Sequence, residues 1–389
     1  MTGVLPLEGI TVVALEQAVA GPLATRHLAD LGARVIKIER PGEGDFARHY
    51  DHAVHGLASH FVWLNRGKES IALDLKSEHG ARVARELIDG ADVFLHNTAP
   101  GVVERLGLDG PTLRASHPRL VVVNISGYGT SGPRKDRKAY DMLIQAESGM
   151  VSVTGTPDTP TKTGVPSADI AAGLYSTISV MSALFRRERT GEGAVVDVSM
   201  FDSAVEWMGH PLYMQLYGGR QIPRMGLSHA AIAPYDAYPT KDGQVLIGVQ
   251  NDRGWRALVT EVFGHPEHAD DPRLATNVER VRHRDECDAL VAGYTSTWTT
   301  TELDERLAEV GIPAAQINST AALVEHPQLA ERDRWRPVET EAGEIRGVLP
   351  PMTFRDVELP MGAVPALGEH TTAILAELGL GATEEATDA

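Results

Sequence analysis

Cysteine is almost absent from this sequence, which has a single one, Cys287, among 389 residues. A single cysteine excludes an intrachain disulfide and is typical of a protein in the reducing cytoplasm, where we expect this one. Cys287 lies between Glu286 and Asp288, and neighbouring carboxylates disfavour a reactive thiolate. We therefore interpret Cys287 as an apolar residue that fills a helix, not as a nucleophile.

Long hydrophobic runs and positive charge are also scarce. No stretch of about 18 uninterrupted apolar residues occurs, so the sequence predicts no membrane span. Residues 1–6 lack a basic region followed by an apolar one, and we expect no secretory leader. The 36 lysines and arginines face 53 aspartates and glutamates, giving a formal net charge of −17. Such a chain lacks the basic surface that nucleic acid requires, so we expect no nucleic-acid partner.

Several common cofactor motifs are missing. The segment Ala20-Gly21-Pro22-Leu23-Ala24-Thr25 lacks the glycine pattern of a dinucleotide-binding turn. Gly67-Lys68-Glu69 lacks the rest of a phosphate-binding loop, and no Gly-x-Ser-x-Gly occurs. The 15 histidines form no HExxH or Cys/His cluster, so the sequence predicts no metal site. We interpret His55 and His60 as surface or capping residues.

The first 200 residues alternate between strand and helix signals. Apolar strands are predicted at residues 11–15, 34–39, 70–74, 92–95, 120–125 and 194–199. Helices are predicted at residues 21–31, 77–89 and 201–217, and after Asp169. Repeated strand–helix units with apolar strands indicate an α/β fold with a mostly parallel sheet covered on both faces.

The pattern changes near residues 218–223. A hairpin signal at residues 235–249 and amphipathic helices such as 301–310 then predict a smaller α+β domain. We place the large α/β domain at residues 1–200, a linker helix and connection at 201–224, the small domain at 225–325 and a return to the large domain at 326–389.

Asp169 stands at a junction between a loop and a helix. Gly164-Val165-Pro166-Ser167-Ala168 precedes it, and a mostly apolar run follows. A carboxylate at the start of a helix accepts hydrogen bonds from free N–H groups and interacts favourably with the helix dipole. Asp169 is therefore either a helix N-cap or a carboxylate nucleophile that the same N–H groups keep ionised.

A short basic run interrupts the acidic sequence at Arg134-Lys135-Asp136-Arg137-Lys138. Taken alone, the run is most simply a solvated turn. Because a small polyanion responds to local charge, net acidity does not exclude such a ligand at this position.

An ordered set of short segments extends along nearly the whole chain. They are Ala20-Gly21-Pro22, residues 35–45, residues 65–74, Ser126-Gly127-Tyr128-Gly129 with Gly132-Pro133, Lys138-Ala139-Tyr140-Asp141, Ser167-Ala168-Asp169 and Leu367-Gly368-Glu369-His370-Thr371. In order and spacing this set resembles the class III CoA transferases, the family of formyl-CoA and carnitine CoA transferases. The resemblance implies a Rossmann-like, CoA-binding large domain built from both chain ends, a small domain from the middle, and an interlocked homodimer.

The resemblance also implies a site, residue by residue. Asp169 matches the catalytic aspartate of the family. The positions that match CoA-binding residues are Ala20, Arg40, Leu73, Asp74, Leu75, Lys76, Asn97, Arg105, Lys138 and Tyr140. CoA and acyl-CoA are then substrates rather than permanent cofactors. Arginines suit this role because they offer phosphate charge-assisted and bidentate hydrogen bonds.

The sequence departs from formyl-CoA transferase at positions near the expected site. Val19 stands where that enzyme has a glutamine, and Tyr50 where it has a tryptophan. Its glycine-rich loop matches residues 225–230 here, which include one glycine. We therefore expect a different acid specificity, with Ser228 and His229 as candidate contacts to the acceptor acid.

The resemblance implies that Asp169 exchanges CoA between an acyl-CoA and a small carboxylic acid through anhydride and aspartyl-CoA intermediates. One alternative is an α-methylacyl-CoA racemase, which needs two acid/base groups, but Tyr140 stands where those racemases have histidine. Another alternative is a non-catalytic CoA-binding protein. The donor and acceptor acids stay open, and Arg224 and Arg253 are either carboxylate ligands or surface charges.

Overall fold

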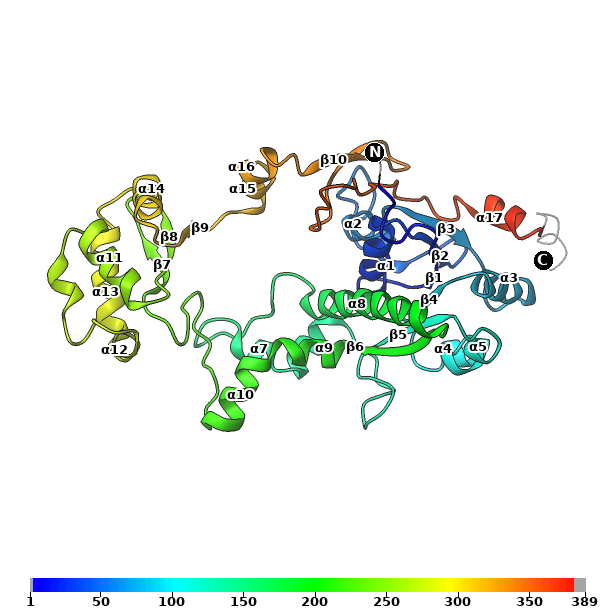
Figure 1. Cartoon of the computed structure of the whole chain (residues 1–389), viewed down its shortest axis with the longest axis horizontal. Coiled ribbons are helices and arrows are strands. Elements are labelled where there is room, and N and C mark those ends of the chain that lie inside the picture. The colour runs from blue at the N-terminus through cyan, green and yellow to red at the C-terminus, as the bar shows by residue number, and fades with distance from the viewer. Residues whose placement is uncertain (1–2, 381–389) are drawn as a thin grey trace. The chain divides into compact units, whose positions relative to one another are not determined.

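The computed structural model describes residues 3–380, which form two compact units (Figure 1). Within the described residues, the first unit comprises residues 3–150, 162–210 and 332–380, and the second comprises Val151–Thr161 and Pro211–Glu331. In this grouping the segment predicted as a linker, residues 201–224, is divided between the two units.

The first unit contains a six-stranded sheet in the order β3-β2-β1-β4-β5-β6, and all of its strand pairs are parallel. This confirms the predicted α/β class with a parallel sheet. The strands are β1 (Thr11–Leu15), β2 (Arg34–Glu39), β3 (Lys68–Ala72), β4 (Val93–His96), β5 (Val121–Ser126) and β6 (Ala194–Ser199). The predicted strand at residues 70–74 begins two residues too late, because Lys68 and Glu69 also pair with β2.

Helices cover both faces of this sheet. Because side chains alternate between the faces of a strand, Val13, Ile36 and Phe94 share one face, where they join a buried cluster with residues of α3 (Glu78–Asp89) and α17 (Thr371–Glu377). On the opposite face α1 (Ala20–Asp30) packs along α8 (Ser167–Thr190). The other helices of this unit are η1 (Phe46–His49), α2 (Ser59–Asn65), α4 (Val102–Leu106), α5 (Gly110–Ser116), α6 (Asp141–Glu147) and α9 (Met200–Trp207). The short helix α7 (Met150–Val153) begins at the last residue of one segment of this unit and continues into the second unit.

Gly173 allows α8 to approach the start of α1 closely. A Cβ atom at this position would lie 2.9 Å from the backbone oxygen of Ala20 and 3.1 Å from the Cβ of Leu23. Any larger residue would push the two helices apart. The close contact brings the first turn of α8, with Asp169, next to the first turn of α1.

By length and composition, α8 is apolar enough to cross a membrane, with a mean hydropathy of 1.4 over its best window. This differs from the expectation based on uninterrupted runs, because serine, threonine and glycine interrupt a helix without making it polar overall. The same helix contacts α1, β5, β6 and α9, as the core helix of an α/β domain does. The finding is therefore weak evidence for a membrane span.

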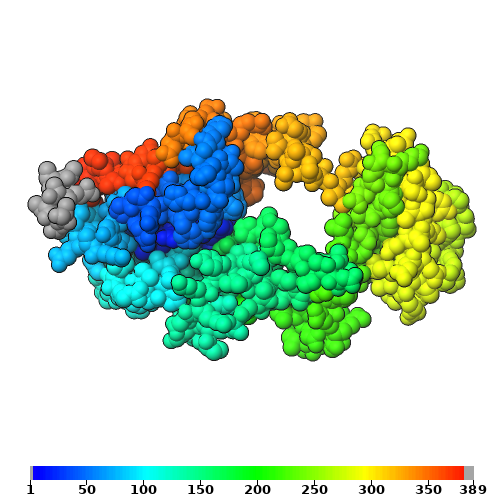
Figure 2. All heavy atoms as spheres, turned by 180° about the vertical axis from the view of Figure 1, so that it is seen from behind, coloured from blue at the N-terminus to red at the C-terminus, as the bar shows by residue number. Residues whose placement is uncertain are grey.

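The C-terminal part of the chain returns to the first unit. It forms an antiparallel pair, β10 (Trp335–Val338) and β11 (Ile345–Val348), and then α17. The backbone N–H of His370 donates to the backbone oxygen of Ser70 at 2.9 Å, which joins this return to β3. In Figure 2 the orange and red C-terminal residues accordingly lie against the blue N-terminal ones.

The helix predicted at residues 201–217 is two helices, α9 and α10 (Gly209–Gly218), which meet at Met208. Helix α9 ends before Met208, and α10 begins at Gly209. Both helices are rich in apolar residues, so their sequences were interpreted as one continuous helix. A glycine at the junction weakens helix continuation, which favours this division.

The second unit has a three-stranded antiparallel sheet, in the order β7-β8-β9, packed with short helices. The predicted hairpin is confirmed by β7 (Tyr235–Pro239) and β8 (Gln244–Gly248), which β9 (Ala314–Gln316) extends. Cys287 lies fully buried in its core, where burial raises the thiol pKa to about 12, as expected of an inert residue. The helices are α11 (Asp252–Ala257), η2 (Leu258–Val262), η3 (Pro266–Ala269), α12 (Asn277–Arg282), α13 (Arg284–Thr295), α14 (Thr300–Val310), α15 (Thr320–Val324) and α16 (Pro327–Ala330).

Candidate active site

The sheet order places a binding crevice between β1 and β4. The strands run parallel, but the side on which successive strands are added changes there, because β2 and β3 lie on one side of β1 while β4, β5 and β6 lie on the other. In open parallel sheets, the loops at the carboxyl ends of two such strands diverge and leave room for a ligand. Here those loops are residues 16–19 after β1 and residues 97–101 after β4.

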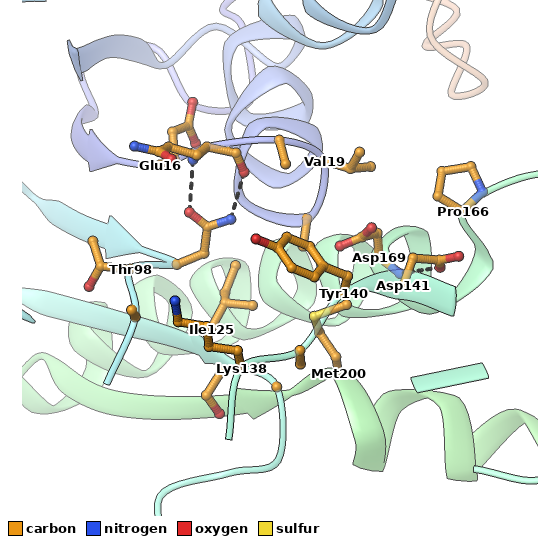
Figure 3. A pocket seen from close by; sticks show the side chains of 18 of the residues that line it. Glu16, Val19, Thr98, Ile125, Lys138, Tyr140, Asp141, Pro166, Asp169 and Met200 are labelled. Atoms are coloured by element: carbon orange, nitrogen blue, oxygen red, sulfur yellow. Dashed lines mark hydrogen bonds between the residues drawn. The ribbon is translucent and has the colours of Figure 1, made fainter. Parts of the chain in front are cut away.

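A cavity of about 530 Å³ opens at this point, and Figure 3 shows the side chains around it. It combines apolar walls with a few polar groups, which is typical of small-molecule sites. Five of the predicted site residues line it: Ala20, Asn97, Lys138, Tyr140 and Asp169.

A second cavity of about 340 Å³ collects the remaining predicted residues. Its lining is mostly apolar, with basic side chains among it, and includes Arg40, Leu73, Asp74, Leu75, Lys76 and Arg105. Leu15 and Thr98 line both cavities, so the two adjoin. We call them together the groove: the Asp169 cavity at one end and the basic cavity at the other.

The start of α8 corrects one expectation about Asp169. The helix begins at Ser167, after Pro166 in the N-cap position, so Asp169 lies within the first turn and is not the cap. Its own backbone N–H, at 3.3 Å, and that of Ala168, at 2.8 Å, donate to Oδ1 of Asp141 instead. The N–H groups expected to hold the Asp169 carboxylate therefore hold a different carboxylate.

Asp141 lines the Asp169 cavity, although the sequence did not indicate it as a site residue. It begins α6, and besides accepting from the start of α8 it accepts a hydrogen bond from Gln145 Nε2 at 2.6 Å. Gln145 in turn accepts from the backbone of Thr163, ahead of α8. Asp141 was visible in the sequence only as the residue after Tyr140, and nothing there indicated its approach to a residue 28 positions later.

The pKa of Asp169 is raised, whereas the sequence reasoning predicted an ionised carboxylate stabilised by N–H groups. Burial raises it to about 7, the negative charge of Asp141 adds to the increase, and a hydrogen bond from the backbone N–H of Ala20 acts in the opposite direction. Asp169 therefore titrates near neutral pH, as a catalytic nucleophile or base does. Figure 3 shows its carboxyl between Val19 and Tyr140.

Asn97 supports the wall of the Asp169 cavity with its side chain. Its amide nitrogen donates to the backbone oxygen of Gln17 at 2.7 Å, and its amide oxygen accepts from the backbone N–H of Gln17 at 2.8 Å. Both ends of the amide are thus occupied. A ligand phosphate accepts hydrogen bonds, so any contact with the Asn97 side chain would use the second N–H of its amide nitrogen.

The cations of the groove are exposed. Arg40 is 66% exposed and pairs with Glu43 at 2.7 Å, and Lys76 and Arg105 also lie at the surface. In the basic run, Arg134 and Arg137 both pair with Glu147, while Lys138 lines the Asp169 cavity. The run is therefore partly a neutralised turn and partly a cavity wall.

The segment at residues 225–230 lies in the second unit. Ser228 Oγ donates to Asp236, and the His229 ring stacks on Tyr235 with ring centroids 5.4 Å apart. Arg224 donates to the backbone oxygens of Thr156 and Pro157. These side chains have partners within their own unit, and their suggested contacts with an acceptor acid stay predictions.

His60 lies closer to the site than the sequence indicated, beside Tyr50, which was expected near the site. Both line the Asp169 cavity, and their rings meet edge to face with centroids 5.5 Å apart. His60 was expected at the surface or in a cap, because no motif surrounds it. Phe46 and Met200, which line the same cavity, carry no sequence signal beyond being apolar.

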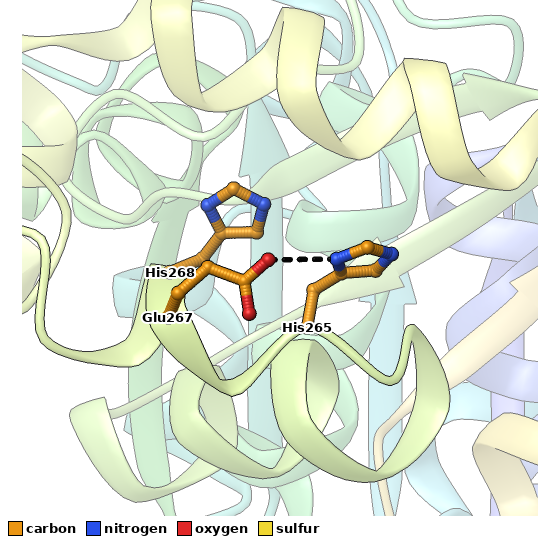
Figure 4. A group of neighbouring side chains, drawn as sticks. All are labelled: His265, Glu267 and His268. Atoms are coloured by element: carbon orange, nitrogen blue, oxygen red, sulfur yellow. Dashed lines mark hydrogen bonds and ion pairs between the residues drawn. The ribbon is translucent and has the colours of Figure 1, made fainter.

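The second unit also contains a group of potential metal ligands that forms no recognised sequence motif, His265, Glu267 and His268 (Figure 4). His265 Nδ1 lies 2.8 Å from Glu267 Oε1, and His268 Nε2 lies 2.9 Å from the hydroxyl of Tyr294. The Glu267 side chain is 64% exposed. Each histidine already has a protein partner and the carboxylate is solvated, so the group needs no metal to satisfy its polar atoms.

The sequence matches CoA-transferase family III over residues 7–371. A succinate–glutarate CoA-transferase of Agrobacterium fabrum is 37% identical over 383 residues, covering 96% of each chain. An acetyl-CoA:oxalate CoA-transferase of Acetobacter aceti is 38% identical over 330 residues, covering 84% of this chain and 85% of the other. The human succinyl-CoA:glutarate CoA-transferase is 32% identical, over 97% of this chain and 87% of the relative.

Solved structures of similar proteins have the same fold as this chain. A CAIB/BAIF family protein from Brucella suis is 38% identical and superposes with a TM-score of 0.84, covering 96% of this chain and 99% of the other. A hypothetical protein from Mycobacterium tuberculosis gives a TM-score of 0.86 at 32% identity, covering 96% of this chain and 100% of the other. A Rossmann-like sheet with a groove at its switch point, together with these matches, defines an enzyme that transfers CoA. The chain belongs to CoA-transferase family III.

Proposed function

We propose that the protein transfers CoA from an acyl-CoA to a small carboxylic acid with Asp169 as the covalent nucleophile. The observation that carries this proposal is the Asp169 carboxyl itself, which has a pKa of about 7 and lies in a cavity that adjoins a basic one. A carboxyl that ionises near neutral pH in a mostly apolar cavity is less solvated than one in water, and is therefore a better nucleophile.

The first half of the reaction transfers CoA to the enzyme. An oxygen of the Asp169 carboxylate attacks the thioester carbonyl of the donor, and the C–S bond breaks to give a mixed anhydride and CoA thiolate. The thiolate then attacks the Asp169 carbonyl of the anhydride, which releases the donor acid and leaves an aspartyl-CoA thioester. Two steps of modest difficulty thus replace a direct exchange and retain the energy of the thioester.

The second half repeats these steps in reverse order. The acceptor carboxylate attacks the aspartyl-CoA thioester and expels CoA thiolate, which forms a new anhydride between Asp169 and the acceptor. The thiolate attacks the acceptor carbonyl of this anhydride, so acyl-CoA forms and the Asp169 carboxylate is regenerated. Each tetrahedral intermediate places negative charge on an oxygen, and the Ala20 N–H beside Asp169 is a donor suited to stabilise it.

The basic cavity supports binding of the CoA nucleotide. Arg40, Lys76 and Arg105 offer charge-assisted donors for phosphates, and Leu73 and Leu75 offer apolar contacts for a base. The shared residues Leu15 and Thr98 then lie along the path by which the thiol end of CoA reaches Asp169.

For the acids we propose short dicarboxylates. Relatives that cover most of this chain are named for succinate, glutarate, oxalate, D-citramalate and mesaconate. The Asp169 cavity has cations at its lining that can attract a second carboxylate, namely Arg137, Lys138 and Lys162. We further propose that the enzyme works in the cytoplasm.

We also propose that two copies of the chain form a homodimer. Along α8, four large apolar side chains at helical spacing are exposed by 37% to 62%: Leu174, Ile178, Met181 and Phe185. Such a stripe on a core helix is the kind of surface that a partner covers. Light scattering of the purified protein tests this, since a monomer at micromolar concentration would contradict it.

A racemase is the second candidate. His60 lines the same cavity as Asp169, and racemisation needs two acid/base groups. The position that such racemases fill with histidine is Tyr140, which is 61% exposed, and the relatives named above are transferases. The observation that would favour a racemase is exchange of the α-proton of an acyl-CoA with solvent.

The decisive experiment detects the covalent intermediate. The protein is incubated with succinyl-CoA and hydroxylamine, and its peptides are examined by mass spectrometry. A hydroxamate at Asp169 that depends on succinyl-CoA and is absent from an Asp169→Asn variant would establish the activated aspartyl group. Unmodified Asp169 together with deuterium incorporation at the α-carbon of the substrate would replace the transferase proposal with the racemase.

A further inference from the structure

Four charged side chains are fully buried behind the loop that joins β1 to α1. Lys37, Lys68, Glu16 and Asp45 each have an exposed fraction of 0%. Removing charges from water costs more free energy than pairing them usually returns, and apolar replacements of buried ion pairs are often neutral or stabilising. Stability therefore offers no sufficient physical reason for this cluster, and its position suggests another role.

Asp45 connects this cluster to the wall of the Asp169 cavity. Its Oδ2 lies 2.9 Å from Lys37 Nζ, in the middle of β2. Its Oδ1 accepts from the backbone N–H of Ala18 at 3.1 Å and from that of Ala47 at 2.9 Å. One carboxylate thus anchors two segments that line the cavity, the loop that contains Ala18 and the helical turn η1 that contains Phe46.

The backbone of Ala18 needs such an anchor. Its φ angle is 63°, in the left-handed region that residues other than glycine rarely occupy. A conformation of this kind persists where the surroundings hold it from several sides. Asp45 holds Ala18 from one side, and the Asn97 amide holds the preceding residue, Gln17, from another.

The turn at Ala18 sets the direction of the next backbone donors. Helix α1 begins at Ala20, two residues further on, and the Ala20 N–H is the group that donates to Asp169. A rotation at Ala18 would turn this N–H away from the carboxyl. The geometry therefore forms a chain of contacts from Lys37 through Asp45 and Ala18 to Ala20 and Asp169.

We propose that the buried Lys37–Asp45 ion pair is a positioning device for the reaction, holding the Ala18 turn so that the Ala20 N–H faces Asp169. The inference rests on the proposed function insofar as Asp169 is the nucleophile. Neither Lys37 nor Asp45 lines the Asp169 cavity. Their effect is to fix the distance and direction of the donor that Asp169 and the oxyanions formed on it require.

The test replaces Asp45 by glutamate and by asparagine. Asp45→Glu keeps the charge beside Lys37 and displaces the carboxylate by one methylene, so it tests the geometry even if Asp45→Asn fails to fold. We expect kcat for CoA transfer from succinyl-CoA to glutarate to fall roughly 10- to 100-fold. Loss of the Ala20 hydrogen bond removes a contact that favours the ionised carboxyl, so the pKa of Asp169 should rise. The acidic limb of the profile of kcat against pH should therefore shift to higher pH by about 0.5 to 1 unit.

Asp30→Glu and Asp30→Asn are matched controls in the same unit. Asp30 is equally buried and forms a two-bond ion pair with Arg66, both at 2.8 Å, without contacting the Ala18 loop. These variants should lower the melting temperature as the Asp45 variants do, but leave the acidic limb in place. Ala18→Gly in the Asp45→Glu background should restore part of the lost kcat, because glycine adopts the left-handed conformation without an anchor.

A second readout needs no turnover. The pH at which the stabilisation of the protein by Asp169→Asn against heat levels off reports the folded-state pKa of Asp169 by linkage, and this pH should rise in the Asp45→Glu background only. Equal shifts in the Asp30 and Asp45 backgrounds, or no shift in either, would overturn the inference. If Asp169→Asn retains CoA transfer, the proposed nucleophile is wrong, whereas the linkage measurement still decides whether Asp45 positions Ala20.

Discussion

The two ends of the groove in the first unit differ in how far their charged groups are exposed to solvent. At the Asp169 end, one carboxyl lies among apolar residues beside Asp141 and the start of α1, and its pKa is raised to about 7. At the basic end, Arg40, Lys76 and Arg105 are exposed, and only the apolar side chains of that cavity, such as Leu73, belong to the buried core.

Under the proposed function, the buried end carries out the covalent reaction and the exposed end binds CoA. A buried carboxyl changes its pKa and its reactivity through its surroundings, so small displacements there alter the rate. Exposed cations keep their charge in any arrangement and act through attraction that salt screens. We therefore expect substitutions at the Asp169 end to change kcat and its pH dependence, and substitutions at the basic end to change KM and its salt dependence.

The largest effect is expected from Asp169→Asn. Without a nucleophile no aspartyl intermediate forms, and kcat should fall roughly 10⁴-fold or more, as for other covalent catalysts. Steady-state assays of CoA transfer from succinyl-CoA to glutarate measure this, with circular dichroism to verify folding. Activity within about tenfold of the wild type would mean that the two ends of the groove do not differ in the way described.

The basic end should respond through binding. The double variant Arg40→Ala with Arg105→Ala should raise KM for succinyl-CoA by roughly 10- to 100-fold at low salt, with little change in kcat, because two charge-assisted phosphate contacts are lost. Steady-state kinetics at several salt concentrations measure this change. Raising the ionic strength should narrow the difference from the wild type.

A matched control for Arg40 is Arg282→Ala. Arg282 is also 66% exposed and pairs with a glutamate three residues away, at 2.8 Å, but it lies in the second unit. Its KM should equal that of the wild type. A comparable increase in both variants would show that general surface charge, rather than the groove, attracts CoA.

A smaller effect concerns stability. Because the folded-state pKa of Asp169 is raised from 3.8 to about 7, the folded protein binds more protons than the unfolded chain between these values, and stability falls as pH rises through that window. Asp169→Asn removes this penalty and should stabilise the protein by up to about 4 kcal/mol at pH 8 and by nothing near pH 3.5. Urea unfolding at both pH values measures it; a destabilised variant at pH 8 would contradict the raised pKa.

The smallest effect is expected from Asp141→Asn. The amide oxygen can still accept from the N–H groups of Ala168 and Asp169, but the neighbouring negative charge is gone, so the pKa of Asp169 should fall. The acidic limb of the pH profile should move downward by roughly 0.5 to 1 unit. The other titratable groups that line the cavity are Glu16, Tyr50, His60, Arg137, Lys138, Tyr140 and Lys162. An unchanged acidic limb would mean that burial alone raises the pKa of Asp169.

The architecture of the first unit was predictable because its signals are local. Apolar strands such as residues 11–15 and 34–39 and the helix at residues 77–89 are confirmed within a residue or so, since strand and helix preferences depend on neighbouring residues. The start of β3 and the division of α9 from α10 were wrong in detail, because pairing partners and chain reversals decide where an element ends.

The candidate site was predictable only as a set of residues. Each position that the resemblance assigned lies on one of two adjoining cavities. The state of Asp169 was not predictable, because the N–H groups expected to serve it donate to Asp141, and its own donor comes from Ala20, in a distant part of the sequence. The roles of these residues in catalysis and binding stay predictions until the experiments above are done.

By itself the sequence determined the α/β class, the strand–helix order, the identity of the chemical groups and the family resemblance, all of which are carried by local patterns and ordered motifs. Only the tertiary structure decided that Asp141 and Ala20 meet Asp169, that Asp45 anchors the turn at Ala18, and that the carboxyl titrates near neutral pH. The physical reason is that pKa values and donor directions depend on burial and on contacts between distant segments. Those contacts exist only after the sheet has brought the carboxyl ends of its strands together.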